Sequence, residues 1–144
     1  MHATVRSVIE HVSNAPQDVC ILDTEASPEH LSRGTARYAD TMLTVVEPYF
    51  KSMETGRRMA TLAEDLGLQD VVLVANKIRD DGELAAVEEF AAAHGLQIAG
   101  VIPFDDALPA AERAGVAPLD FDPDGRAVQA IADLARRVVT NGRA

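Results

Sequence analysis

One stretch of the sequence indicates how the chain folds: Val19-Cys20-Ile21-Leu22-Asp23-Thr24-Glu25-Ala26-Ser27-Pro28-Glu29-His30. Its first four residues are apolar without alternation, which is typical of a strand buried on both faces of a parallel sheet. Ser27 and Pro28 suit the N-cap and the first turn of a helix. The stretch therefore predicts a strand that ends at Asp23, a short acidic loop and the start of a helix.

Asp23 is a candidate ligand for a metal ion. Open α/β sheets bind their ligands at the carboxyl ends of the strands, and a carboxylate beside the free N–H groups of a helix start can hold Mg²⁺ next to a phosphate. Glu25, Glu29 and His30 are close enough in sequence to join Asp23 in a cluster. The same pattern is typical of an ordinary corner with solvated acids, and this stretch alone favours that simpler interpretation.

The composition indicates one domain, residues 1–144, because 47% of the 144 residues are hydrophobic and can form a core. A formal net charge of -10 argues against nucleic acid or an anionic membrane surface as a partner. Cys20 is the only cysteine, so an internal disulfide is excluded, and we expect this residue in the core. No apolar segment is long enough for a membrane span, which predicts a cytoplasmic protein.

Apolar runs alternate with helical periodicity along the rest of the chain. The pattern predicts strands at residues 19–23, 42–47, 71–75 and 97–102, and an extended segment at 116–121. It predicts helices at residues 3–13, 28–38, 52–66, 80–95, 107–114 and 122–139, with Ser52 as an N-cap and Glu54 and Arg58 as an ion pair. The expected fold is α/β, with a parallel sheet of about four strands and flanking helices.

Asn76 and Lys77 follow the third predicted strand and resemble the base-reading loop of P-loop GTPases. Arg79 stands where the guanine-specific N-K-x-D motif has Asp, so guanine is disfavoured, whereas the amide of Asn76 can match an adenine edge. A hydrogen bond from Asn76 to the loop backbone is the alternative, which a dipeptide alone favours. The phosphate-binding motif G-x-x-x-x-G-K-[ST] occurs nowhere in the 144 residues.

Several segments together resemble the CooC-type ATPases of the MinD/ParA group of deviant P-loop proteins. Residues 23–35 match their D-x-E-A-G-x-E-H-L-x-R-G-T signature except that Ser27 replaces the glycine. Residues 45–48 (V-V-E-P) and 52–55 (S-M-E-T) also match, as do 74–77 and 100–105 in order and spacing. The resemblance covers nearly the whole chain and implies the carboxyl-terminal half of a P-loop NTPase domain, which is Rossmann-like.

The resemblance implies a role for each matching residue. Asp23 would be the Walker B acid that holds Mg²⁺ through water, the loop from Thr24 to Ser27 the γ-phosphate switch, and Asn76 a neighbour of adenine. Glu47 and Pro48 would lie near the nucleotide or a dimer face. The implied nucleotide-binding residues are Asp23, Glu25, Ser27, Asn76, Lys77, Pro103, Phe104 and Asp105.

The resemblance also implies which parts of the family pattern are missing. The P-loop strand, the signature lysines and a C-x-C metal pair do not occur in this sequence. ATP, ADP and Mg²⁺ would therefore bind poorly, nickel has no support, and we expect no ATP hydrolysis by this chain alone. The expected function is that of a CooC/MinD-like ATPase fragment, a split-enzyme half or a degenerate relative, linked to maturation of a nickel enzyme such as carbon monoxide dehydrogenase.

The resemblance further implies that a P-loop strand would lie between residues 20–23 and 42–46. Without it, the two predicted strands would either pair directly or be completed by a second chain, and we expect the latter: a second copy or a complementary P-loop-bearing chain, with a metalloenzyme as possible client. The alternative functions are a non-catalytic α/β interaction module and a receiver-like domain that uses Asp23. The acid pair that a receiver needs on its first strand is not clear in the sequence.

Overall fold

The structure, a computed structural model, describes residues 19–23 and 39–141. In this part of the chain three parallel strands form one sheet in the order β1-β2-β3, with β1 at Thr41–Val46, β2 at Asp70–Ile78 and β3 at Gln97–Pro103. The predicted α/β fold with a parallel sheet is confirmed, with one strand fewer than expected. The described residues also form the helices α3 (Phe50–Asp65), α4 (Asp81–Ala93), α5 (Ala107–Ala114), α6 (Pro118–Phe121) and α7 (Arg126–Asn141).

The prediction of a strand at residues 19–23 is wrong. These five residues have no regular secondary structure, and all are exposed, with Ile21 87% exposed. Cys20 is also exposed, so its predicted place in the core is wrong as well. A buried parallel strand needs a neighbouring strand for its backbone and helices for its faces, and nothing in the described residues supplies these to this run.

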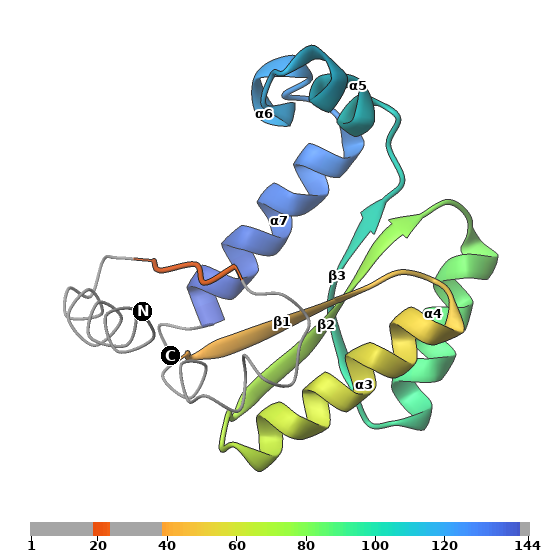
Figure 1. The fold of residues 1–144 in the computed structure, drawn as a ribbon, viewed down its shortest axis with the longest axis vertical. Coiled ribbons are helices and arrows are strands. Elements are labelled where there is room, and N and C mark those ends of the chain that lie inside the picture. The colour runs from red at the N-terminus through yellow and green to blue at the C-terminus, as the bar shows by residue number, and fades with distance from the viewer. Residues whose placement is uncertain (1–18, 24–38, 142–144) are drawn as a thin grey trace.

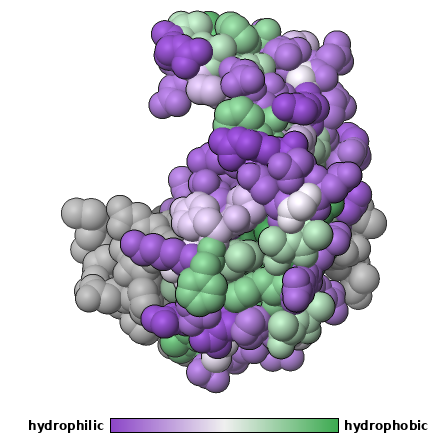
Figure 2. Space-filling view, turned by 90° about the vertical axis from the view of Figure 1, so that its right-hand side faces the viewer, coloured by the Kyte–Doolittle hydropathy of each residue, from purple (hydrophilic) through white to green (hydrophobic). Residues whose placement is uncertain are grey.

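The helices form a layer on each face of the sheet (Figure 1). α3 and α4 lie on one face and α7 lies on the other, while α5 and α6 project beyond the sheet at the amino end of α7 (Figures 1 and 2). The helices predicted at residues 3–13 and 28–38 lie outside the described residues. None of the helices in the described ranges is long and apolar enough to cross a membrane.

The larger core lies between the sheet and the helices α3 and α4. Alternate residues of β1 and β2 point to this face, and Val46, Leu73 and Ala75 are at most 1% exposed. α3 approaches β1 so closely that a Cβ atom at Gly56 would lie 2.4 Å from Cγ1 of Val46. Glycine is therefore required at this position for α3 to pack against the strand.

The opposite face is covered only in part. Leu134 of α7 packs against Val74 of β2 and Ile102 of β3. α7 does not extend over β1, so Leu43 and Val45 on this face are 38% and 57% exposed. Within the described residues β1 also has a strand partner on one edge only. Among residues 19–23 and 39–141, α3 covers one face of β1, while the other face is largely exposed and the outer edge has no strand partner.

Local signals set most helix ends correctly. Asp80 caps α4 by accepting a hydrogen bond from the Glu83 N–H at 2.8 Å, and α5 ends at Gly115 in the left-handed conformation. The predicted ion pair of Glu54 with Arg58 is confirmed at 2.9 Å. Glu54 is also bonded to Arg57, and the hydrogen bonds from Arg57 and then Arg58 lower its pKa to about 2.

Three helix starts differ from the prediction. The last helix, predicted to start at residue 122, is α7 and begins at Arg126. α3 begins at Phe50 with Tyr49 at the N-cap position, while Ser52 accepts a hydrogen bond from the backbone N–H of Glu47 at 3.0 Å. Ser52 therefore fixes the loop before the helix and does not cap it. The segment predicted to be extended at 116–121 contains α6, whose first residue is Pro118. The fixed φ of proline suits the first turn of a helix, which explains this start.

Candidate functional site

The carboxyl ends of the three strands meet at one edge of the sheet because the strands are parallel. An ion pair joins the first two ends, with Nζ of Lys77 2.7 Å from Oε1 of Glu47. The backbone N–H of Phe104 donates to the carbonyl of Ile78 at 2.8 Å, which joins the second end to the third. These contacts hold the loops that follow β1, β2 and β3 in one continuous surface, which we call the carboxyl edge.

Lys77 has a strained backbone at this edge. Its φ angle is 60°, in the left-handed region, and it is the one residue other than glycine with positive φ in the described part of the chain. This conformation costs about 1–2 kcal/mol for an L-residue. The register between β2 and β3 shifts between Asn76 and Ile78, so Lys77 forms a bulge there. Bulges and strained residues of this kind are frequent at binding sites, where they redirect a side chain.

Asn76 lies half-buried just before the bulge, opposite Ile102 of β3. Among the described residues, its side-chain amide has no hydrogen-bond partner. The alternative, a hydrogen bond from the Asn76 side chain to the loop backbone, is therefore not found among the described residues. An amide with unused donor and acceptor groups beside a strand end is suited to bind a purine edge.

Phe104 contributes an aromatic ring to the same edge. The guanidinium carbon of Arg79 lies 4.2 Å from the centre of this ring, a cation–π contact. The backbone N–H of Arg79 donates to the carboxylate of Glu83 at 2.7 Å. Arg79, which replaces the Asp of the guanine motif, thus packs on Phe104. Sequence reasoning missed this contact because the two residues are 25 positions apart and only the fold brings them together.

Asp105 connects two helix starts. Its Oδ1 accepts the Ala107 N–H at 3.0 Å, and its Oδ2 accepts the Ala127 N–H at 3.2 Å. These two bonds, chiefly the one from Ala107, hold the pKa of Asp105 below its usual range, and the charge of Arg126 adds to the effect. Both carboxylate oxygens already have partners, so the role of Asp105 towards a nucleotide stays a prediction, as does that of Pro103 at the end of β3.

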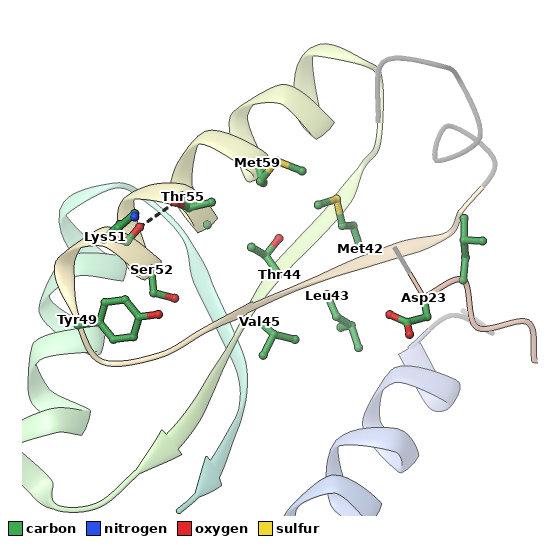
Figure 3. A pocket seen from close by; sticks show the side chains of 12 residues that line it. Asp23, Met42, Leu43, Thr44, Val45, Tyr49, Lys51, Ser52, Thr55 and Met59 are labelled. Atoms are coloured by element: carbon green, nitrogen blue, oxygen red, sulfur yellow. Dashed lines mark hydrogen bonds between the residues drawn. The ribbon is translucent and has the colours of Figure 1, made fainter. Parts of the chain in front are cut away.

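Asp23 does not join these residues. It lies beside Leu43, towards the start of β1, whereas Tyr49 marks the other end of the strand (Figure 3). Glu25, Ser27, Glu29 and His30 lie outside the described residues. The structure thus brings together the predicted base-side residues and leaves Asp23 apart. Within the ranges 19–23 and 39–141, no group of three or more His, Cys, Asp or Glu residues is arranged to hold a metal ion.

A groove of about 460 Å³ runs along the open side of β1, between the strand, α3 and the segment 19–23 (Figure 3). Hydroxyl groups of Tyr49, Ser52 and Thr55 lie towards one end and apolar side chains towards the other. The Thr44 hydroxyl in its wall is buried without a hydrogen-bond partner among the described residues. Its lining residues are Leu22, Asp23, Met42, Leu43, Thr44, Val45, Tyr49, Lys51, Ser52, Thr55, Gly56 and Met59.

Comparison of the sequence with known proteins identifies relatives, although no family model matches the chain. The carbon monoxide dehydrogenase accessory protein CooC of Rhodospirillum rubrum is 33% identical over 122 residues, which are 85% of this chain and 46% of that protein. The uncharacterized ATP-binding protein MJ0823 of Methanocaldococcus jannaschii is 34% identical over 118 residues, again 46% of its length. The chain thus spans about half the length of the curated relatives it matches.

Solved structures of MinD are similar in fold. The MinD cell division protein of Aquifex aeolicus has a TM-score of 0.61 and 28% identity, over 74% of this chain and 46% of the other. MinD of Pyrococcus horikoshii in complex with Mg-ADP has a TM-score of 0.68 over 98% of this chain and 58% of that one, with 14% identity. The resemblance expected from the sequence is confirmed: the chain is similar to CooC over 85% of its residues, shares the fold of the MinD structures and corresponds to about half of such a protein.

Proposed function

We propose that this chain forms the base side of a CooC/MinD-like ATP site whose phosphate-binding loop lies outside the 144 residues. The observation that carries this proposal is the unpartnered amide of Asn76, which is half-buried at the bulge of the carboxyl edge in the described part of the chain. Phe104 follows β3 on the same edge, so that an aromatic ring and an amide are available from adjacent strands. The relative MJ0823 is described as an ATP-binding protein, which supports adenine over other bases.

The residues of the chain fit one part of ATP and not the other. Asn76, Pro103 and Phe104 would bind the adenine side, and their backbone is held, together with that of Lys77, by contacts between three strand ends. For the triphosphate the sequence offers no loop of N–H groups and no signature lysine. Asp23 would hold Mg²⁺ through water, as the Walker B acid, only where the segment 19–23 joins a complete sheet.

Calorimetry on the pure chain with AMP, ATP and GTP tests the proposal. We expect weak binding of AMP and ATP with about equal affinity, because the groups that read the phosphates are missing. Asn76→Ala removes one hydrogen bond, worth about 1 kcal/mol, and should weaken both ligands by roughly fivefold. Gln69→Ala is the control, since its amide bonds to Gly67 at the opposite end of the sheet. A strong preference for ATP over AMP, or for GTP over ATP, would contradict the proposal.

We expect no ATP hydrolysis by the chain alone. Most of the acceleration of phosphoryl transfer comes from charges and N–H groups placed around the phosphates, and the sequence lacks these. Phosphate release should stay at the level of a protein-free control with Mg²⁺ present. Magnesium-dependent turnover that Asp23→Ala abolishes would overturn this expectation.

We propose that a P-loop-bearing segment completes the ATP site by adding at the open edge of β1; a second copy of the chain would fill that edge without supplying a phosphate-binding loop. An added strand would pair with the backbone of β1 and cover Leu43 and Val45, which are exposed. One MinD structure is a MinC:MinD complex, and CooC is named as an accessory protein of carbon monoxide dehydrogenase. By analogy with CooC, the complete assembly would act in the cytoplasm on a metalloenzyme client.

A non-catalytic interaction module is the second candidate. The observation that favours it is the groove beside β1, which combines apolar walls with a Thr44 hydroxyl that has no partner among the described residues. The two functions differ in the effect of nucleotide. If binding of a partner at this groove is unchanged by saturating ATP and by Asn76→Ala, the module is favoured; if ATP strengthens it, the half-site is favoured.

A further inference from the structure

The ion pair between Glu47 and Lys77 lies beside the bulge that carries Asn76. It joins residues 30 positions apart, at the ends of β1 and β2, with a distance of 2.7 Å. The pair is partly exposed, with 51% of the Lys77 side chain and 33% of the Glu47 side chain accessible. A pair this exposed contributes little to global stability. We therefore expect the ion pair to act on the local conformation of the loop after β2.

Lys77 occupies a position that glycine would occupy without strain. Its φ of 60° is readily adopted by glycine and disfavoured for residues with a Cβ atom. The side chain of Lys77 ties this strained residue to the end of β1 through its contact with Glu47. Glu47 in turn is held from its own side, since its backbone N–H donates to Ser52 at 3.0 Å.

The loop after β2 is also held on its other side. The carbonyl of Ile78 accepts the Phe104 N–H, and Arg79 packs on the ring of Phe104. The backbone around Asn76 is thus fixed between the Glu47 contact from β1 and the Phe104 contact from β3. Asn76 itself has no side-chain hydrogen bond in the described part of the chain, so its orientation depends on that backbone.

We infer that Glu47 and Lys77 are positioning residues: their ion pair holds the left-handed bulge that presents the Asn76 amide to an adenine base. This inference rests on the proposed function for its ligand, and on the described geometry for the bulge. Lys77 then acts through Asn76, and its ammonium group is engaged with a carboxylate from the neighbouring strand. The pair couples the loop after β1 to base recognition after β2.

The decisive variant is Lys77→Gln, because it removes the charge of the ion pair and leaves the left-handed backbone at position 77 equally disfavoured. We expect the midpoint of urea unfolding to change little, while AMP affinity falls roughly two- to fivefold. If the ion pair only stabilised the fold, the unfolding midpoint and the AMP affinity would fall together. Glu47→Gln should weaken AMP similarly, and in an Asn76→Ala background neither variant should have a further effect. Arg58→Gln, which breaks an exposed pair on α3, is the control and should leave AMP affinity unchanged.

Amide hydrogen exchange separates this inference from the proposed function. In Glu47→Gln the amides of residues 76–79 should exchange at least severalfold faster than in the unchanged chain, whether or not AMP binds. If AMP does not bind to the unchanged chain, the proposed function fails while the exchange still measures the effect of the pair. Unchanged exchange at these amides, or equal AMP affinity with and without the pair, would overturn the inference.

Discussion

Two runs of this chain are similar in sequence and different in structure. Val19-Cys20-Ile21-Leu22 and Val71-Val72-Leu73-Val74-Ala75 are both unbroken, apolar and rich in β-branched residues. The second forms the centre of β2, where Leu73 is 1% exposed, whereas Ile21 of the first is 87% exposed. β2 has β1 on one edge and β3 on the other, and a helix layer on each face. An apolar run becomes a buried strand only where its neighbours supply both edges and both faces.

The largest expected effect concerns the buried run. Leu73→Ala should lower the free energy of unfolding by about 2–5 kcal/mol, because it leaves a cavity between β2 and the helices α3 and α4. Ile21→Ala removes a similar side chain from an exposed position and should change the free energy of unfolding by about 0.5 kcal/mol or less. Urea denaturation of the two variants measures the difference. Equal losses would mean that Ile21 is buried in solution.

The second prediction concerns self-association of the chain at β1. Both apolar runs lie near β1, which within the described residues has an open edge and exposed apolar residues on one face. We expect the chain to self-associate at micromolar concentration in sedimentation experiments, because such an edge offers unpaired backbone groups to a second chain. Val45→Lys should weaken this association by roughly tenfold, about 1.4 kcal/mol.

Leu119→Lys is the control for that experiment, because Leu119 is an exposed apolar residue of α6 rather than of an edge strand of the sheet. It should leave the association unchanged. A cooperatively melting monomer at all concentrations would overturn the expectation of association. If instead Ile21→Ala weakens association as strongly as Val45→Lys, the segment 19–23 takes part in the contact.

The sequence predicts the elements of the fold that depend on local signals, and fails where the structure depends on neighbouring elements. The strands β1, β2 and β3 and the ends of α4 and α5 were predictable, because periodicity, Asp80 and Gly115 are local signals. The irregular, exposed conformation of residues 19–23 was not predictable. An apolar run indicates a buried strand only if neighbouring strands and helices are present, and the run itself does not show whether they are. The pattern of Pro118 at the first turn of α6 was present in the sequence and was overlooked.

The candidate site divides in the same way. Asn76 was predictable, since a polar residue after an unbroken apolar run marks the carboxyl edge. The left-handed φ of Lys77 was not predictable, because the amino-acid sequence around Lys77 does not differ from that of an ordinary strand end. The Arg79–Phe104 contact and the Asp105–Ala127 bond join distant positions, so only the packing of the elements reveals them. The groove beside β1 was missed because an edge without a neighbour has no sequence signature.

The smallest expected effect compares two acids that the sequence places after strands. Asp105 accepts two backbone N–H groups, which lower its pKa, whereas Asp23 is exposed. A lowered pKa in the folded state contributes stability above the ordinary pKa of about 3.9, and this contribution is lost as the pH falls through the folded-state value. Asp105→Asn should therefore lower stability at pH 7, and the loss should become smaller as the pH falls below about 3.9.

The reason for the loss lies in the amide that replaces the carboxylate. In the Asp105→Asn variant the one remaining side-chain oxygen can still accept a bond, but the new NH₂ group would face the second N–H, so either Ala107 or Ala127 loses its acceptor at a helix start. Asp23→Asn, the matched control, should change stability little at pH 7 or at acidic pH. Thermal melts of both variants between pH 2 and pH 7 measure the difference. A pH-independent loss in Asp105→Asn would mean that the charge of Asp105 does not stabilise the junction of α5 and α7.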